Sequence, residues 1–101
     1  MDVDQIKWAS DAFVTSNTIL DVRTPLEYSE GYISNAVNLN IYDANAFMSK
    51  VQTFNKEKNY YIYCKSGGRS SQACQIMSQL GFNNVFNLVG GITNWKGEIV
   101  K

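Results

Sequence analysis

Residues 60–88 read YYIYCKSGGRSSQACQIMSQLGFNNVFNL, and this stretch decides the fold class. Residues 60–63 are aromatic and β-branched, which predicts a strand. From Arg69 to Leu80 the apolar residues recur at helical spacing, which predicts a helix that ends at Gly81. Residues 85–88 predict the next strand. A strand, a loop with two glycines, a helix and another strand in this order are typical of a parallel sheet.

The rest of the chain continues this alternation. Short strands are predicted at residues 19–22 and 37–39, and a helical turn at 26–29 that stops at Gly31. Three more helices are predicted: one capped by Asp4, with Ile6, Ala9, Ala12 and Phe13 on one buried face; one over residues 43–54, capped by Asp43; and a short one around 92–95. We therefore expect a single α/β domain over residues 1–101, with a parallel sheet covered by helices on both faces.

The charge balance narrows the class of partners. Nine Lys and Arg residues balance nine Asp and Glu residues, so no surplus of positive charge attracts nucleic acid or anionic membranes. The first four residues include two aspartates, whereas a secretory signal begins with positive charge, and no stretch approaches the roughly 20 apolar residues that span a bilayer. We expect a soluble, cytoplasmic protein with reduced thiols and without nucleic-acid or membrane partners.

The absence of histidine limits the chemistry that the chain can perform. Without histidine, the chain cannot build a Ser-His or Cys-His nucleophile pair from its own residues. Two cysteines alone also cannot supply the tetrahedral Cys and His set of a structural zinc site. We expect no metal and no cofactor, and any nucleophile must be activated by other means.

Cys64 is the candidate nucleophile because it follows a predicted strand and precedes a predicted helix. The carboxyl ends of strands in open α/β sheets are where ligands bind. Gly67 and Gly68 allow the loop to curl until its N–H groups point inward, and the helix that follows directs its unpaired N–H groups to the same place. With Lys65 and Arg69 nearby, this surrounding favours a thiolate. Lowering the pKa of a cysteine by about 2 units from about 8.5 corresponds to roughly 2.7 kcal/mol and makes the thiolate the major form at neutral pH.

Several motifs in the chain resemble the rhodanese homology family. An Asp-x-Arg motif is present at Asp21 and Arg23, a Glu-aromatic-x-x-Gly motif at residues 27–31, a Cys-x-x-x-x-Arg loop at residues 64–69, and Gly-Gly-Ile followed by Trp at residues 90–95. Their order, more than any single motif, makes the resemblance specific. It implies a three-layer fold with a central, mainly parallel sheet of about five strands.

The resemblance also implies a function and a set of site residues. The family moves a sulfane sulfur from a donor such as thiosulfate to a thiophilic acceptor, which is cyanide, a thiol or a protein cysteine, through a cysteine persulfide. On this chain the persulfide falls on Cys64, and the pocket floor on the loop that binds the substrate, composed of Lys65, Ser66, Gly67, Gly68, Arg69 and Ser70. The chain departs from the family at Tyr32, where histidine is usual, and at Ser34-Asn35, where Pro-Gly is common. Asn35 tolerates a left-handed turn, so we expect the turn to persist.

Several residues have a structural as well as a functional interpretation. Arg69 is expected to orient the loop by pairing with a carboxylate such as Glu27 or Asp21. Asp21 and Arg23 either pair with each other or face the pocket, and pairing is the simpler interpretation. Lys65 either steers an anionic substrate or is a solvated loop residue.

Two further interpretations concern small side chains near Cys64. Ser66 and Ser70 either donate hydrogen bonds to the sulfur or cap the helix, with capping favoured for Ser70. Cys74 lies beside the apolar side of the helix, about 7.5 Å along its axis from Arg69, so we expect a core residue and no disulfide to Cys64.

Two other functions compete with sulfur transfer. A cysteine phosphatase or arsenate reductase also uses a thiolate in an anion-binding loop closed by arginine. Those loops characteristically place five residues between Cys and Arg, whereas this chain has four, residues 65–68, and a smaller loop suits a single terminal sulfur. The other alternative is a non-catalytic or sulfur-carrier module that docks on a partner protein.

Overall fold

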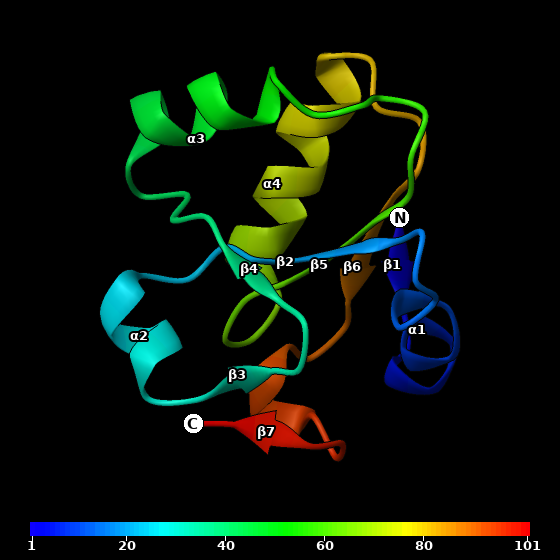
Figure 1. Ribbon diagram of the computed structural model, residues 1–101, viewed down its shortest axis with the longest axis vertical. Coiled ribbons are helices and arrows are strands. Elements are labelled where there is room, and N and C mark those ends of the chain that lie inside the picture. The colour runs from blue at the N-terminus through cyan, green and yellow to red at the C-terminus, as the bar shows by residue number, and fades with distance from the viewer.

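Five parallel strands form the central sheet of the computed structural model, which describes residues 1–101 (Figure 1). Every neighbouring pair in this sheet is parallel. In spatial order the strands are β1 (Asp2–Val3), β6 (Val85–Leu88), β5 (Tyr60–Tyr63), β2 (Thr18–Asp21) and β4 (Val37–Asn38). The sequence-based prediction of a mainly parallel sheet of about five strands is confirmed.

Helices and one small antiparallel pair of strands complete the fold. The helices are α1 (Gln5–Ala12), α2 (Pro25–Ser29), α3 (Ala44–Val51), α4 (Gly68–Gln79) and the 3₁₀ helix η1 (Ile92–Asn94). Strands β3 (Tyr32–Ile33) and β7 (Ile99–Val100) pair antiparallel outside the main sheet. None of the helices combines the length and the apolar character needed to cross a membrane.

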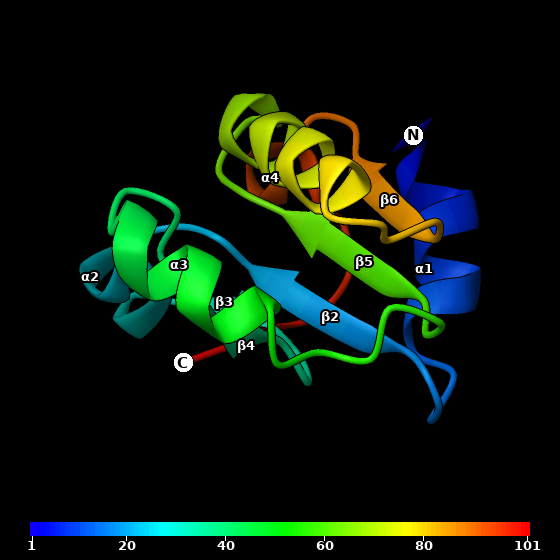
Figure 2. The same cartoon turned by 90° about the horizontal axis from the view of Figure 1, so that it is seen from above.

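Each face of the sheet has its own hydrophobic core because side chains alternate along a strand. On β5, Tyr60 and Ile62 face a core shared with α3 and α4, and Tyr61 and Tyr63 face a second core shared with α1. Figure 1 shows α3 and α4 above the strands and α1 below them, and Figure 2 shows α3 and α4 nearest the viewer in the view from above. The three-layer arrangement therefore follows from β5 being apolar on both faces.

The buried face of α1 differs from the predicted one. Ala12 is buried as expected, but Ile6 is 82% exposed and Phe13 is 41% exposed, while Trp8 is fully buried. The Trp8 ring packs edge-on against Tyr61 and Tyr63, and its indole N–H donates to the Phe86 carbonyl at 3.3 Å. Burial of one tryptophan outweighs burial of the smaller apolar residues on the opposite side of the helix, so Trp8 sets the orientation of α1.

Most other elements confirm the predictions, with shifted ends. The third helix ends at Val51 instead of residue 54, and α4 begins at Gly68, one residue before Arg69. Asn35 adopts a left-handed conformation with φ 72°, as expected for the turn where the family commonly has Pro-Gly. The two-residue strands β1, β3 and β7 were not predicted, because two residues carry no alternating pattern.

Candidate active site

The segment from Cys64 to Ser70 leads from the carboxyl end of β5 into the first turn of α4 (Figure 1). Cys64 is only 1% exposed and lies on the α3 and α4 side of the sheet. Gly67 is the N-cap of α4 with φ 115°, a conformation that disfavours other residues, and it turns the loop inward. As a result, the Cys64 Sγ accepts hydrogen bonds from the Gly67 N–H at 3.0 Å and from the Ser70 hydroxyl at 3.4 Å.

These hydrogen bonds stabilise the thiolate form of Cys64. Burial by itself raises the pKa of the thiol, because it penalises the charged form. The Ser70 hydroxyl and the N–H groups of Ser70, Gly67 and Ser66 act in the opposite direction, and the net result is a Cys64 pKa below its ordinary value. The sequence-based expectation that the loop itself favours the thiolate, without histidine, agrees with this direction.

The second cysteine has the opposite environment. Cys74 lies on the buried side of α4 and packs in the core, and burial raises its pKa to about 11. Both cysteines are free thiols. Cys74 is therefore a core residue, as predicted, and remains protonated at neutral pH.

The turn at Gly90-Gly91 and the two residues after it contact the backbone of the Cys64 loop. The N–H groups of Ile92 and Thr93 donate to the carbonyl oxygens of Cys64 and Lys65, both at 3.0 Å. Gly91 lies against the same two carbonyls so closely that no Cβ fits there. The sequence identified a turn at Gly90-Gly91 but not its contact with the loop, because such a contact between distant segments leaves no local pattern.

Arg69 is tied to Glu27 of α2. Its Nη1 donates to Glu27 Oε1 at 2.7 Å and its Nη2 to Oε2 at 3.0 Å. The Glu27 carboxylate also accepts from the Thr24 N–H and hydroxyl, as part of a capping box. Arg69, opposed by burial and helped by Thr24, lowers the pKa of Glu27 to about 2. Glu27 is therefore the carboxylate partner that was predicted for Arg69, and the orientation of the loop by this pair stays a prediction.

Asp21 and Arg23 form a separate buried pair. The Arg23 Nη2 lies 2.7 Å from Asp21 Oδ2, and the same oxygen accepts the Tyr63 hydroxyl at 2.7 Å. The Arg23 Nη2 also donates to the Gly31 carbonyl at 2.7 Å. Pairing, the simpler of the two sequence interpretations, therefore describes Asp21, whereas Arg23 both pairs with Asp21 and lines a cavity beside the loop. Together they hold β2, β5 and the chain after α2 in place.

Lys65 is the loop cation that remains without a carboxylate partner. Its side chain is exposed, and no ion pair is formed by it. It lines a cavity of about 300 Å³ between α2 and the loop, together with Arg23, Glu27 and Glu30. Positive and negative groups are therefore mixed in this cavity, and the charge of Arg69 is offset by Glu27.

Ser66 and Gly68 are exposed to solvent, whereas Ser70 is buried beside Cys64. Ser66 is exposed and contributes its N–H, and Gly68 is exposed in the first turn of α4, with open space where a Cβ would lie. Ser70 does not cap the helix, contrary to the favoured prediction, because Gly67 is the N-cap and Ser70 falls inside the first turn. Its fully buried hydroxyl instead lies between Cys64 Sγ and Asn87 Oδ1.

Asn87 is the functional candidate that the sequence analysis missed. It lies in β6, is 4% exposed, and contacts both Ser70 and Gly67. A polar residue in an otherwise apolar strand, Val85-Phe86-Asn87-Leu88, was the available signal.

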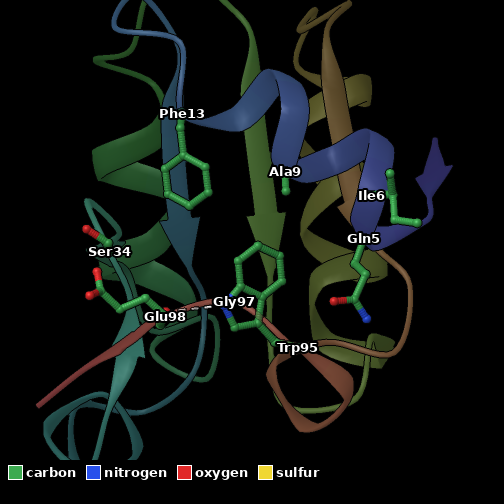
Figure 3. Close-up of a pocket in the computed structure, with 8 residues that line it drawn as sticks. All are labelled: Gln5, Ile6, Ala9, Phe13, Ser34, Trp95, Gly97 and Glu98. Carbon is green, nitrogen blue, oxygen red and sulfur yellow. Dashed lines mark hydrogen bonds between the residues drawn. The ribbon is translucent and has the colours of Figure 1, made fainter.

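A second cavity, of about 450 Å³, lies away from the loop between α1 and the C-terminal segment (Figure 3). Phe13 and Trp95 line it, with ring centroids 6.3 Å apart. Its lining includes no cysteine, only one serine and only one charged side chain, so it does not resemble the site at Cys64. No group of three or more His, Cys, Asp or Glu side chains is arranged to hold a metal ion.

Comparisons with known proteins find rhodanese-like domains and sulfurtransferases, both by sequence and by structure. A sequence model of the rhodanese-like domain matches residues 5–98. A sulfurtransferase of Allochromatium vinosum is 40% identical over 77 residues, covering 76% of this chain and 69% of that protein. The chloroplastic thiosulfate sulfurtransferase 16 of Arabidopsis thaliana is 33% identical over 96 residues, covering 86% and 80%. The crystal structure of a rhodanese-related protein from Thermoplasma volcanium matches with a TM-score of 0.78 at 32% identity, covering 98% and 96%.

Proposed function

The chain belongs to the rhodanese-like domain family, and from this premise we propose that it is a sulfurtransferase that carries a sulfane sulfur as a persulfide on Cys64. The donor is a small sulfur compound such as thiosulfate or a persulfide, and the acceptor is cyanide, a thiol or a protein cysteine. We further propose that residues 1–101 form one catalytic domain that acts in the cytoplasm, where thiols stay reduced.

The reaction consists of two displacements at sulfur. In the first, the Cys64 thiolate attacks the outer sulfur of thiosulfate; a new S–S bond forms, the donor's S–S bond breaks, and sulfite leaves with the electron pair. In the second, the acceptor attacks the outer sulfur of the persulfide, the Cys64 S–S bond breaks, and the thiolate is regenerated. Neither step requires a proton transfer to Cys64, so a chain without histidine can perform both.

The observation that carries the proposal is the hydrogen bonding of the Cys64 sulfur. The Gly67 N–H at 3.0 Å and the Ser70 hydroxyl at 3.4 Å donate to Sγ at the start of α4. Charge-assisted hydrogen bonds of this kind stabilise a thiolate, and the helix N-terminus adds to the effect. The same donors would stabilise the anionic form of the persulfide.

Mass spectrometry after treatment with thiosulfate tests the proposal. We expect an adduct with the mass of one sulfur atom on the peptide that contains Cys64, formed with release of sulfite, and continued release of sulfite from excess thiosulfate when cyanide or a thiol is present to accept the sulfur. Cys64→Ser should lose both while remaining folded, and Cys74→Ala is the matched control that should keep both. Full activity of Cys64→Ser would refute the assignment.

The same experiment separates the competing functions. A persulfide on Cys64 that passes its sulfur only to one partner protein would identify a sulfur carrier. Hydrolysis of a phosphate ester without a persulfide would identify a phosphatase.

A further inference from the structure

Asn87 is a polar residue at an interior position of the sheet. It lies in β6, opposite Asp2 of β1 on one side and Ile62 of β5 on the other, and it is 4% exposed. Buried polar groups in folded proteins are hydrogen-bonded, since leaving one unpaired costs about 1–3 kcal/mol. The partners of its amide therefore indicate why an asparagine stands among apolar residues.

The amide of Asn87 has a defined orientation. Its Nδ2 donates to Asp2 Oδ1 at 3.0 Å and to the Gly67 carbonyl at 3.4 Å. Both partners are acceptors only, so the NH₂ group must face them and the opposite orientation would bring three oxygens together. The Oδ1 atom is consequently directed at the Ser70 hydroxyl.

Ser70 has one hydroxyl proton and three acceptors within reach. These are Asn87 Oδ1, the Gly67 carbonyl at 3.2 Å and the Cys64 Sγ at 3.4 Å. A hydroxyl donates only one proton at a time, so the acceptors compete for it. The Asn87 oxygen is the nearest of the three, whereas the sulfur becomes a strong acceptor only when it carries a negative charge.

We propose that Asn87 is a positioning residue for Cys64, which accepts the Ser70 hydroxyl proton while the sulfur is a neutral thiol and yields it when the sulfur becomes an anion. The charge on the sulfur thereby controls the direction of the Ser70 hydroxyl. The inference deepens the proposed function, on which it rests for the role of Cys64 as nucleophile. In the resting state, Asn87 therefore opposes ionisation of the Cys64 thiol, because its amide oxygen competes with the sulfur for the Ser70 hydroxyl proton.

Other charged groups around Cys64 are shared by every variant in the test. Arg69, which interacts with Cys64, is paired with Glu27, and Lys65 is adjacent in the loop. Asp2 lies behind Asn87. The Met1 ammonium donates to the Val85 carbonyl at 3.2 Å. The contributions of Arg69, Lys65 and the Met1 ammonium are the same in every variant. The hydrogen bond to Asp2, which Asn87→Leu removes, is lost in both Ser70 backgrounds and therefore cancels in the double-mutant cycle.

The test is a double-mutant cycle on the pH dependence of Cys64 alkylation. The rate of iodoacetamide modification is measured from pH 5 to 10 on the Cys64 peptide by mass spectrometry, so that Cys74 does not contribute. Ser70→Ala removes the donor and should move the midpoint up by about 0.5 to 1 pH unit. Asn87→Leu removes the competing acceptor and should move the midpoint down by a similar amount. In the Ser70→Ala background, Asn87→Leu should leave the midpoint unchanged.

The inference is overturned if Asn87→Leu raises the midpoint, leaves it in place, or shifts it equally in both backgrounds. Asn87→Val, which suits a strand, replaces Asn87→Leu if circular dichroism shows that the leucine variant is unfolded. Alkylation does not depend on sulfur transfer, so the two ideas fail separately. If the alkylation midpoints shift as predicted but no persulfide forms on Cys64, the proposed function alone is refuted. If a persulfide forms but the alkylation midpoints do not move, the role of Asn87 alone is refuted.

Discussion

Replacing Glu27 with glutamine should destabilise the protein, and the loss should depend on pH. In Glu27→Gln the amide oxygen can still accept from Thr24, so the capping box is kept while the charge that pairs with Arg69 is removed. The change therefore isolates the ion pair that anchors the Cys64 loop to α2. Arg69 would then carry an uncompensated charge at a site where its side chain is 16% exposed.

The size of the effect follows from the pKa of Glu27. A pKa of about 2 in the folded protein, against about 4.3 in an unfolded chain, corresponds to about 3 kcal/mol as an upper bound. Part of this depression comes from Thr24, and solvent screens a side chain that is 25% exposed. We therefore expect Glu27→Gln to lower the free energy of unfolding at pH 7 by about 1–2 kcal/mol, which is a fall in Tm on the order of 5–10 °C.

The pH dependence follows from the direction of the shift. Because the folded pKa is depressed, the stabilisation by the Glu27 carboxylate is complete above about pH 5 and is lost as the pH falls from about 4.3 towards 2. Urea unfolding at pH 7, 5, 4 and 3 should show a constant gap between the wild type and Glu27→Gln at the two higher values and a narrowing gap below. Glu30→Gln, an exposed change at the end of the same helix, is the control and should be neutral. A gap that stays constant down to pH 3, or no gap at pH 7, would refute the reasoning.

Three other variants test separate parts of the structure. Lys65→Ala should lower kcat/KM for thiosulfate by about two- to fivefold, with a smaller effect at high salt, and an unchanged steady-state rate would contradict its role in attracting anions. Gly91→Ala should destabilise the protein by more than about 2 kcal/mol in urea unfolding, because its Cβ would meet two loop carbonyls, whereas Gly68→Ala, in open space on a helix, should be neutral or slightly stabilising. Trp8→Ala should cost about 3–5 kcal/mol and Ile6→Ala almost nothing, and similar thermal shifts for the two would contradict the observed orientation of α1.

The elements that the sequence predicted well are those with a regular pattern and a decisive end. The apolar spacing from Ala73 to Leu80 and the stop at Gly81 placed α4 within one residue at its start and its end. In α1 the same method counted apolar residues without weighing their size, and it chose Ile6 and Phe13 over Trp8. The large aromatic side chain of Trp8 determines the orientation of α1, and the spacing of apolar residues carries no information about side-chain size.

The prediction for Ser70 failed for a different reason. It depended on where the helix begins, and helix ends are the least certain part of any assignment from sequence. Because Gly67, with a positive φ, is the N-cap and the helix begins at Gly68, Ser70 lies on the inner side of the first turn instead of at the cap position. Its partner Asn87 lies 17 residues away along the chain, and no local pattern connects the two.

The pairing of Arg69 with Glu27 bears on the choice between sulfur and phosphate chemistry. A phosphate dianion bound in a cysteine loop needs a guanidinium whose donors are free to bind its oxygens. In this chain both terminal nitrogens of Arg69 donate to Glu27, at 2.7 and 3.0 Å. Binding phosphate there would leave only the three remaining N–H donors of Arg69 for its oxygens and would place a second anion beside the Glu27 carboxylate. A terminal sulfur with at most one negative charge needs only the N–H groups and the Ser70 hydroxyl that surround Cys64, so the ion pair favours sulfur transfer independently of the four-residue spacing of the loop.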